Sequence, residues 1–398
     1  MSVKEITKDI FCVTLERKEN GLRFEGIWEI PTGVTLNSYI VRDEKICLID
    51  TVLENAGDEL CADLKSIDIS FSKIDYIVLN HVEPDHSGFI IEAVKENPNV
   101  EIFATEKGAN FIKKFFKINA KIHAITNGGT LSLGKKTLQF FEAMNVHWPE
   151  TMMTFCVEER VLFSCDCFGG YGTFGGKILE SENTNESLEN YKSECLRYYA
   201  NIMASFNSFV TKAIEKLPEE IKIICPSHGI VWNKNPRTAI SLYEKYARYG
   251  NGEELENEVC VIWASMYGYT KTGVDAVVRG LEKRGARITM LRIPETSQSY
   301  VLEKAYKAKA LLLAMPTYEY KMFPPMAHIL DLFERKRFIK KTVLRIGNWG
   351  WIGGAKREYD ARIENMQWNN LPSYEWQGVL SACDISNLEK LGEQLAGN

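Results

Sequence analysis

The chain has 398 residues, which is too long for one ordinary domain, so two domains are expected. Its 45% hydrophobic and 25% charged residues are typical of a globular protein with a substantial core. The net charge of −5 argues against a nucleic-acid binder, and no apolar run is long enough to span a membrane. The amino-terminal residues lack the apolar segment of a signal peptide, and ten scattered cysteines form no C-x-x-C pair. We therefore expect a cytoplasmic protein in a reducing compartment.

The first half of the chain predicts a mixed α/β arrangement. Apolar or alternating runs indicate strands over residues 10–15, 35–41, 45–50 and 74–79, with a helix over 57–67. Asp50 ends the third of these strands, where it either caps the next segment or supports a nearby loop; we favour the cap. Further strands are expected at 100–105, 121–125, 138–143, 152–157, 160–163 and 221–225, and helices at 107–117 and, as one long stretch, 187–216.

A dense cluster of potential metal ligands follows the strand at 74–79. His81, Glu83, Asp85 and His86 lie within six residues, on a loop between a strand and a helix that opens near Gly88. Such loops carry the chemistry of α/β folds, because their backbone is not committed to strand pairing. Two imidazoles and two carboxylates at this density are costly to bury without a cation. The cluster therefore favours a metal site over a solvated turn.

Three later residues, His147, Asp166 and His228, each come just after an apolar strand. Together with the first cluster they suggest one rim onto which several strands bring polar ligands. Four imidazoles and three carboxylates exceed the needs of one tetrahedral ion, so the set predicts a two-metal centre in which Asp166 can bridge. Oxygen and imidazole donors with open positions suit iron that binds small gases. Cys165 and Cys167 flank Asp166, and we expect their side chains to point away.

Beyond a composition break at residues 246–258, four β-α units alternate. Strands are expected at 259–264, 287–292, 308–314 and 342–347, with helices near 272–284, 301–307, 325–336 and 354–366, which predicts a doubly wound parallel sheet. The first loop opens a helix, where hydroxyls and backbone N–H groups suit a phosphate, although it is not a Walker loop. Three strand-end loops carry residues that could bind a phosphate and flank a planar ring: Ser265, Met266, Tyr267, Gly268, Tyr269 and Thr270; Pro316, Thr317, Tyr318 and Glu319; and Asn348, Trp349, Gly350 and Trp351.

These motifs resemble the flavodiiron proteins. The His-x-x-x-Asp-His core with later His, Asp and His is similar to the metallo-β-lactamase fold, and Glu83 stands where its hydrolases usually carry histidine. The resemblance implies a metallo-β-lactamase-like αββα sandwich binding two irons over residues 1–250, and a flavodoxin-like domain binding FMN over 256–398. It implies that His81, Glu83, His147 and bridging Asp166 hold one iron, and that Asp85, His86, His228 and Asp166 hold the other.

The resemblance also implies an activity and partners. The expected reaction is reduction of dioxygen to water or of nitric oxide to nitrous oxide, with electrons passing from an external donor through FMN to the diiron centre. The donor is expected to be a rubredoxin-like protein or a reduced deazaflavin, and the assembly a head-to-tail homodimer or a dimer of dimers. Arg335, Lys336, Arg337, Lys340 and Lys341 either steer an acidic donor or form a solvated helix end.

Some features depart from the pattern of this family or leave the function of the chain open. Trp351 and Ile352 interrupt the glycine run at 350–354, and no histidine precedes His81, so the distal-pocket histidine of some members is missing. The preferred gas is therefore left open. A zinc hydrolase of the metallo-β-lactamase fold with a flavodoxin-like domain is the alternative enzyme, and a flavin electron carrier with an incomplete metal site is the non-enzymatic alternative. Tyr198 or Tyr199 either lines the pocket or is a core residue.

Overall fold

The computed structural model describes residues 2–397, which fall into two compact units, one ending at Glu244 and the other beginning at Lys245. Helix α7 (Pro236–Gly250) contains this division. No helix among residues 2–397 combines the length and the apolar character needed to cross a bilayer. The ten cysteines are all unpaired.

The first unit is built on two sheets. The larger has the order β1-β2-β5-β6-β7-β8-β9; its first four strands are antiparallel, and the strands from β6 to β9 are parallel. The smaller has the order β10-β11-β12-β13-β14 and is antiparallel except for the β13–β14 pair. The strands are β1 Ser2–Thr7, β2 Ile10–Arg17, β5 Val34–Arg42, β6 Ile46–Ile49, β7 Tyr76–Val78, β8 Glu101–Thr105, β9 Lys121–Ile125, β10 Thr130–Ser132, β11 Thr137–Glu142, β12 Met152–Cys156, β13 Val161–Cys165 and β14 Ile223–Pro226.

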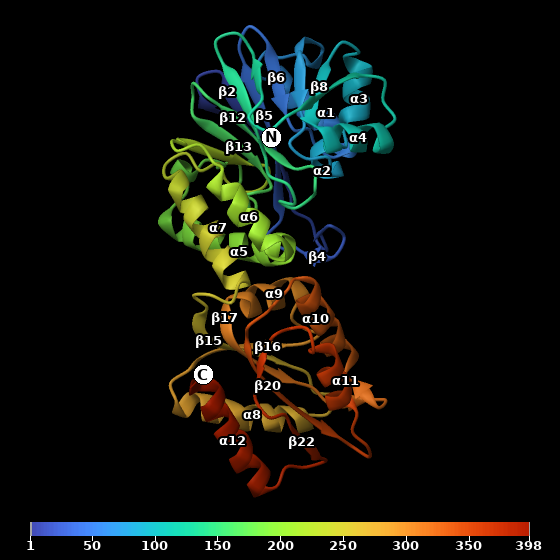
Figure 1. Ribbon diagram of the computed structural model, residues 1–398, viewed down its shortest axis with the longest axis vertical. Helices are drawn as coiled ribbons and strands as arrows, with labels where there is room; N and C mark the ends of the chain where they lie inside the picture. The colour runs from blue at the N-terminus through green and yellow to red at the C-terminus, as the bar shows by residue number, and fades with distance from the viewer. Residues whose placement is uncertain (1, 398) are drawn as a thin grey trace. The chain divides into compact units, whose positions relative to one another are not determined.

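Alternation along the strands gives this unit two cores. Cys12 and Tyr39 of the larger sheet point toward Phe140 and Phe163 of the smaller one, and these form the layer between the sheets. Val13 and Ile40, one residue along, face the opposite way and pack against the helices on the outer face (Figure 1). The helices are α1 Gly57–Lys65, α2 Pro84–Ser87, α3 Ile90–Glu96, α4 Glu106–Phe115, α5 Asn185–Tyr198 and α6 Asn207–Glu215, with a small hairpin of β3 Arg23–Phe24 and β4 Trp28–Glu29. This arrangement is the expected αββα sandwich.

The long helix expected over residues 187–216 is interrupted. A π-helical turn spans Tyr199–Met203, and a 3₁₀ turn at Ala204–Phe206 precedes α6. The extra residue of a π turn rotates the side chains on either side of it, and such turns concentrate at functional sites. The apolar periodicity of residues 187–216 does not predict this local change of helix type.

The second unit is a parallel sheet with the order β16-β15-β17-β20, and both β21 and β22 pair with β20. This order corresponds to 2-1-3-4-5, the flavodoxin arrangement. Helices α8 and α12 cover one face, with Val277 and Leu388 in the shared core, while α9 and α10 lie on the other (Figure 1). The elements are β15 Glu256–Trp263, α8 Tyr269–Lys283, β16 Arg287–Arg292, α9 Gln298–Lys307, β17 Ala308–Ala314, β18 Thr317–Tyr318, β19 Lys321–Met322, α10 Pro324–Arg335, β20 Thr342–Trp349, α11 Ala355–Arg362, β21 Asn369–Asn370, β22 Tyr374–Gln377 and α12 Ala382–Gly397.

Candidate metal centre and flavin loops

The ligand loop after β7 is held at its first residue by Asp50. Asp50 accepts hydrogen bonds from the backbone N–H of Asn80 at 2.8 Å and from its side-chain amide at 3.4 Å. The next 3₁₀ turn, Glu54–Ala56, has Leu53 at its N-cap, without a side-chain cap. The expectation that Asp50 caps the following segment is therefore wrong, and the residue supports the ligand loop instead. Asp50 meets Asn80 because β6 pairs with β7, and the local sequence does not predict this contact.

Short-range packing makes the loop turn sharply into α2. Pro84 occupies the first turn of α2, where its missing N–H has no helical partner to lose. The Ser87 hydroxyl donates to the carbonyls of Val82 and Glu83 at 2.8 and 2.9 Å, which ties the turn together. Gly88 lets another segment approach, because a Cβ there would lie 2.6 Å from the Pro84 oxygen and 2.7 Å from the Glu54 nitrogen. His86 is thus helical, one turn earlier than the sequence predicts.

All seven predicted ligands converge in the first unit. The three ligands outside the first loop each follow a strand: His147 lies in the β11–β12 loop, Asp166 comes directly after β13, and His228 lies two residues after β14. Asp166, His81 and His228 are at most 1% exposed, while Glu83 and Asp85 keep 15% and 13% of their side chains accessible. The two partly accessible carboxylates therefore mark the side from which the cluster is reached.

The ligand atoms divide into two sets that share Asp166. In the first, the Nε2 atoms of His81 and His147 each lie 3.1 Å from Glu83 Oε2 and 3.6 Å from Asp166 Oδ2. In the second, the Nε2 atoms of His86 and His228 lie 3.1 and 3.2 Å from Asp166 Oδ1, and 3.4 and 3.3 Å from oxygens of Asp85. Ligand atoms at about 2.0–2.1 Å around a tetrahedral ion are themselves about 3.3–3.4 Å apart. Each set therefore has the spacing of a metal site.

Several of these atoms lack the hydrogen bonds that buried polar atoms require. Both Asp166 oxygens, Asp85 Oδ1, and the Nε2 atoms of His86 and His228 are buried without a hydrogen-bond partner among residues 2–397. Such orphaned atoms are rare in folded proteins and call for an explanation. Two cations, one within each set, would satisfy all of them at once. Nitrogen and carboxylate donors without thiolate are the ligands of iron, manganese or zinc.

The carboxylates give the cluster a strong demand for positive charge. Burial alone would lower the pKa of His86, but the charges of Asp85 and Asp166 outweigh burial and raise it to about 10. Burial also opposes the charged form of His228, yet its contacts with Asp166 and Asp85 raise its pKa to about 10. Burial raises the pKa of Asp166, but the neighbouring imidazoles lower it more, so this pKa lies well below its ordinary value. The carboxylates therefore favour positive charge in the cluster, either as protons on the imidazoles or as metal ions.

A second layer of residues, which the sequence did not identify, orients the imidazoles. His81 Nδ1 donates to Glu150 Oε1 at 2.7 Å, and the same oxygen accepts the Val82 N–H at 3.0 Å. His228 Nδ1 donates to the Thr35 carbonyl at 2.7 Å. These contacts leave each Nε2 free to bind a metal. Glu150 lies one residue after the His147-Trp148-Pro149 motif, and that proximity was the available signal.

Cys165 departs from expectation. Its sulfur lies with a carboxylate oxygen of Asp50 and a ring nitrogen of His86 in a group whose atoms are all within 4.8 Å of one another. Burial raises its thiol pKa well above the ordinary value, so it packs beside the centre as a neutral group. Cys165 therefore does not point away from the cluster. The backbone at Cys165 has a φ of 53°, which breaks the strand alternation on which that expectation rested.

The predicted flavin residues lie on three loops at the carboxyl ends of β15, β17 and β20. Gly268 has a φ of 93° and donates its N–H to Ser265 Oγ at 3.0 Å, directly before α8. Thr270 Oγ1 donates to Asn348 Oδ1 at 2.6 Å, which joins the first loop to the third. Tyr267 and Trp351 are 85% and 76% exposed. Tyr320 and Ile352, which are also exposed, adjoin these loops and were not among the predicted contacts.

One of the basic residues that were expected to steer an acidic donor is not at the surface. Lys341 is 1% exposed, and its Nζ donates to the carbonyls of Tyr306 and Ala308 at 2.6 and 2.8 Å. Arg335 pairs with Asp331 at 2.8 Å. The inclusion of Lys341 was wrong, because its side chain, directly before β20, is buried and held by two backbone carbonyls.

Comparisons with known proteins agree with this geometry. The family model described as ODP family beta lactamase matches residues 34–229. The nitric oxide reductase of Moorella thermoacetica is 30% identical over 372 residues, covering 92% of this chain and 90% of that protein. The anaerobic nitric oxide reductase flavorubredoxin of Vibrio vulnificus is 30% identical, covering 93% of this chain and 74% of that protein. The chain belongs to the flavodiiron protein family.

Solved structures agree across both units of this flavodiiron protein. A mutant flavo di-iron protein from Thermotoga maritima has a TM-score of 0.89 at 28% identity, covering 99% of this chain and 98% of that one. The rubredoxin oxygen:oxidoreductase of Desulfovibrio gigas has a TM-score of 0.93 at 25% identity, covering 100% and 98%. The fold is therefore the predicted combination of a metallo-β-lactamase-like and a flavodoxin-like part, and the cofactors of this family are FMN and a diiron centre. The protein is an oxidoreductase.

Proposed function

We propose that this flavodiiron protein reduces nitric oxide to nitrous oxide, dioxygen to water, or both, with electrons that pass from an external donor through FMN to a diiron centre. The observation that carries the proposal is the pair of ligand sets that share the two oxygens of Asp166. A zinc hydrolase of this fold would need no flavin loops, and a simple electron carrier would need no such cluster.

In this proposal each iron takes two imidazoles and one terminal carboxylate. His81, His147 and Glu83 hold the first iron, and His86, His228 and Asp85 hold the second, with Asp166 bridging them. When bound, the iron pair supplies electrons to the gas and sites at which it is held. Glu150 and Thr35 accept hydrogen bonds from the Nδ1 atoms of His81 and His228, which leaves the Nε2 atom of each ring for the metal. Residues 1–250 are the proposed diiron domain.

Residues 256–398 are the proposed FMN domain. The Ser265–Thr270 loop at the start of α8 would bind the phosphate through N–H groups and hydroxyls, as helix N-termini do. Tyr267 and Trp351, which are exposed, would contact the planar ring. Thr270→Val should weaken FMN binding about fivefold to tenfold, because it removes the bond to Asn348 without changing side-chain volume. Ser386→Ala, which removes an exposed hydroxyl on α12, is the control.

The partners follow from the same proposal. We place the protein in the cytoplasm. We also propose a head-to-tail homodimer or a dimer of dimers, because the exposed aromatic residues of the flavin loops would be covered in such an assembly. The electron donor is a rubredoxin-like protein or a reduced deazaflavin. Sedimentation tests the assembly: a fully active monomer would exclude electron transfer between subunits.

The deciding experiment is anaerobic reduction of the purified protein followed by parallel assays of nitric oxide and dioxygen consumption, with iron, zinc and flavin quantified. We expect two irons and one FMN per chain, and consumption of at least one gas. His228→Ala should lose one iron and turnover but keep FMN, whereas His123→Ala, outside the cluster, should behave as wild type. Zinc in place of iron with ester hydrolysis, or full activity of His228→Ala, would refute the proposal.

A further inference from the structure

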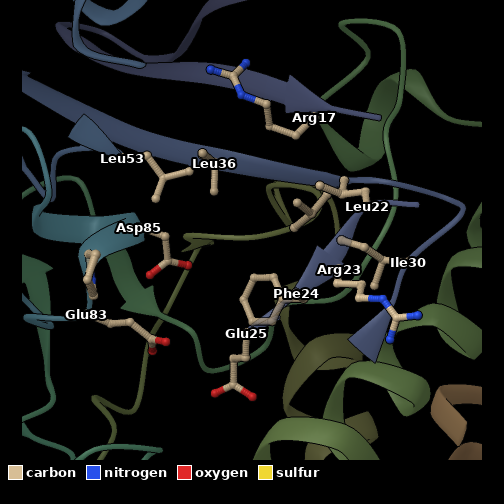
Figure 2. Close-up of a pocket in the computed structure, with 12 residues that line it drawn as sticks. Arg17, Leu22, Arg23, Phe24, Glu25, Ile30, Leu36, Leu53, Glu83 and Asp85 are labelled. Atoms are coloured by element: carbon tan, nitrogen blue, oxygen red, sulfur yellow. The ribbon is translucent and has the colours of Figure 1, made fainter. Parts of the chain in front are cut away.

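A cavity of about 280 Å³ adjoins the metal centre within the first unit (Figure 2). One end is formed by Glu83, Pro84 and Asp85. Glu83 is the terminal carboxylate of the first ligand set, and Asp85 is that of the second. Its other walls come from the β2 end, the β3 hairpin, β5 and the loop before α1. The cavity therefore reaches the partly accessible side of both ligand sets, where a small substrate would approach.

The side chains of this cavity are mostly apolar. Leu22, Phe24, Ile30, Val34, Leu36 and Leu53 line it. Arg17 and Arg23 also line it, but their guanidinium groups pair with Glu59 at 2.7 Å and with Glu29 at 2.6 Å. Glu25 accepts the Trp28 indole N–H at 3.0 Å. Apart from the metal ligands, the polar side chains on the wall are thus engaged with neighbours rather than directed at a substrate.

Phe24 lines the cavity beside His228 and two tyrosines. Its ring stands edge-on to His228, with centroids 5.2 Å apart. Tyr171 and Tyr198 lie 5.6 and 6.0 Å from Phe24, and Tyr198 also lies 5.9 Å from His228, but neither tyrosine lines the cavity. The expectation that Tyr198 or Tyr199 lines the pocket therefore resolves in favour of the core. Among these rings, the one that lines the cavity beside His228 is therefore the hydrocarbon ring of Phe24 and not a phenol.

We propose that this cavity makes the protein prefer nitric oxide to dioxygen, with Phe24 as a specificity-determining residue; the inference rests on the proposed function. Dioxygen takes up four electrons and four protons to give two waters. Two nitric oxide molecules take up two electrons and two protons to give nitrous oxide and one water. Positioned hydrogen-bond donors stabilise the negative charge that develops on a reduced oxygen species and are worth about 10²–10³ in rate. An apolar wall provides no such donors. The missing stabilisation lowers the rate of dioxygen reduction more than the rate of nitric oxide reduction.

The size of the cavity favours the same substrate. A molecule about the size of water occupies on the order of 30 Å³, so a cavity of about 280 Å³ has room for two diatomic gas molecules together. Coupling two nitric oxide molecules requires both to be held close to one another, whereas dioxygen reduction requires one. An apolar cavity also concentrates neutral, poorly hydrated gases.

The test compares kcat/KM for the two gases in the iron- and FMN-loaded protein. Wild type should prefer nitric oxide by at least about tenfold. Phe24→His and Leu53→Gln each place a donor on the wall, and each should shift the ratio toward dioxygen by about tenfold. Leu53 is half-buried, so its variant should fold even where Phe24→His does not. Leu131→Gln, a half-buried residue on β10 away from the cavity, should leave the ratio unchanged.

A second measurement does not depend on activity. Xenon binds apolar cavities, so xenon NMR of the metal-free protein should detect a site that Leu53→Gln weakens several-fold and Leu131→Gln does not. A wild-type preference for dioxygen, an unchanged ratio in both cavity variants, or no xenon site sensitive to Leu53 would overturn the inference. Consumption of neither gas by protein loaded with iron and FMN would instead refute the proposed function itself.

Discussion

Replacement of Glu150 by glutamine tests whether the contact behind His81 positions a metal ligand. The carboxylate oxygen lies 2.7 Å from His81 Nδ1 and also accepts the Val82 N–H, so glutamine keeps the shape and an acceptor but loses the charge. Loss of such an outer partner lowers metal affinity by about 10–100-fold. That factor corresponds to about 1.4–2.7 kcal/mol of binding free energy. The loss should fall on the ligand set that contains His81, because that imidazole is the ligand to which Glu150 is hydrogen-bonded.

The assay is a chelator titration of the iron-loaded protein, followed by iron quantitation. Glu150→Gln should release its first iron at a chelator concentration about 10–100-fold lower than wild type, and the second iron near the wild-type concentration. Glu215→Gln, an exposed residue at the end of α6, is the matched control and should titrate as wild type. If Glu150→Gln retains both irons at wild-type chelator concentrations, Glu150 does not act through His81. Equal loss of both irons would show that the two ligand sets are not independent.

Three further predictions concern the cluster and the second unit. Asp166→Ala should lose both irons but keep FMN, because one oxygen of Asp166 serves each set; metal and flavin analysis checks this, and one retained iron would contradict it. Addition of divalent metal to the metal-free protein near pH 7.5 should release protons, because the imidazole pKa values of His81, His86 and His228 are raised to about 10 there and metal binds the neutral ring. Affinity should therefore increase with pH, and a pH-indicator titration without proton release would refute this. Burial lowers the pKa of Lys341 to about 7 from 10.5, so between these values the unfolded chain binds more protons and Lys341 makes stability rise with pH. Urea unfolding of Lys341→Met at pH 7, 8 and 9 should show a flatter dependence than wild type, and an unchanged slope would contradict the buried position.

The sequence by itself was sufficient to predict the ligand types and the class of fold. His81, Glu83, Asp85 and His86 lie close together in the chain, and His147, Asp166 and His228 each follow an apolar strand. The strand ends of one layered fold meet at a common rim, so strand-end position was enough to predict convergence. The repeated β-α pattern after residue 258 likewise predicted the parallel sheet, because short right-handed connections leave few other arrangements.

Only the tertiary structure determined which atoms meet and what surrounds them. Glu150 contacts His81 across 69 residues, and Asp50 contacts Asn80 across 30, so local sequence does not show which residue each of them supports. Phe24 reads as an ordinary apolar residue, and its place against His228 depends on a hairpin brought there by other elements. Lys341 looks like part of a basic surface, yet β20 turns it inward. Local sequence sets periodicity and turn chemistry, whereas long-range packing selects the partners of each side chain, and selectivity for a gas depends on those partners.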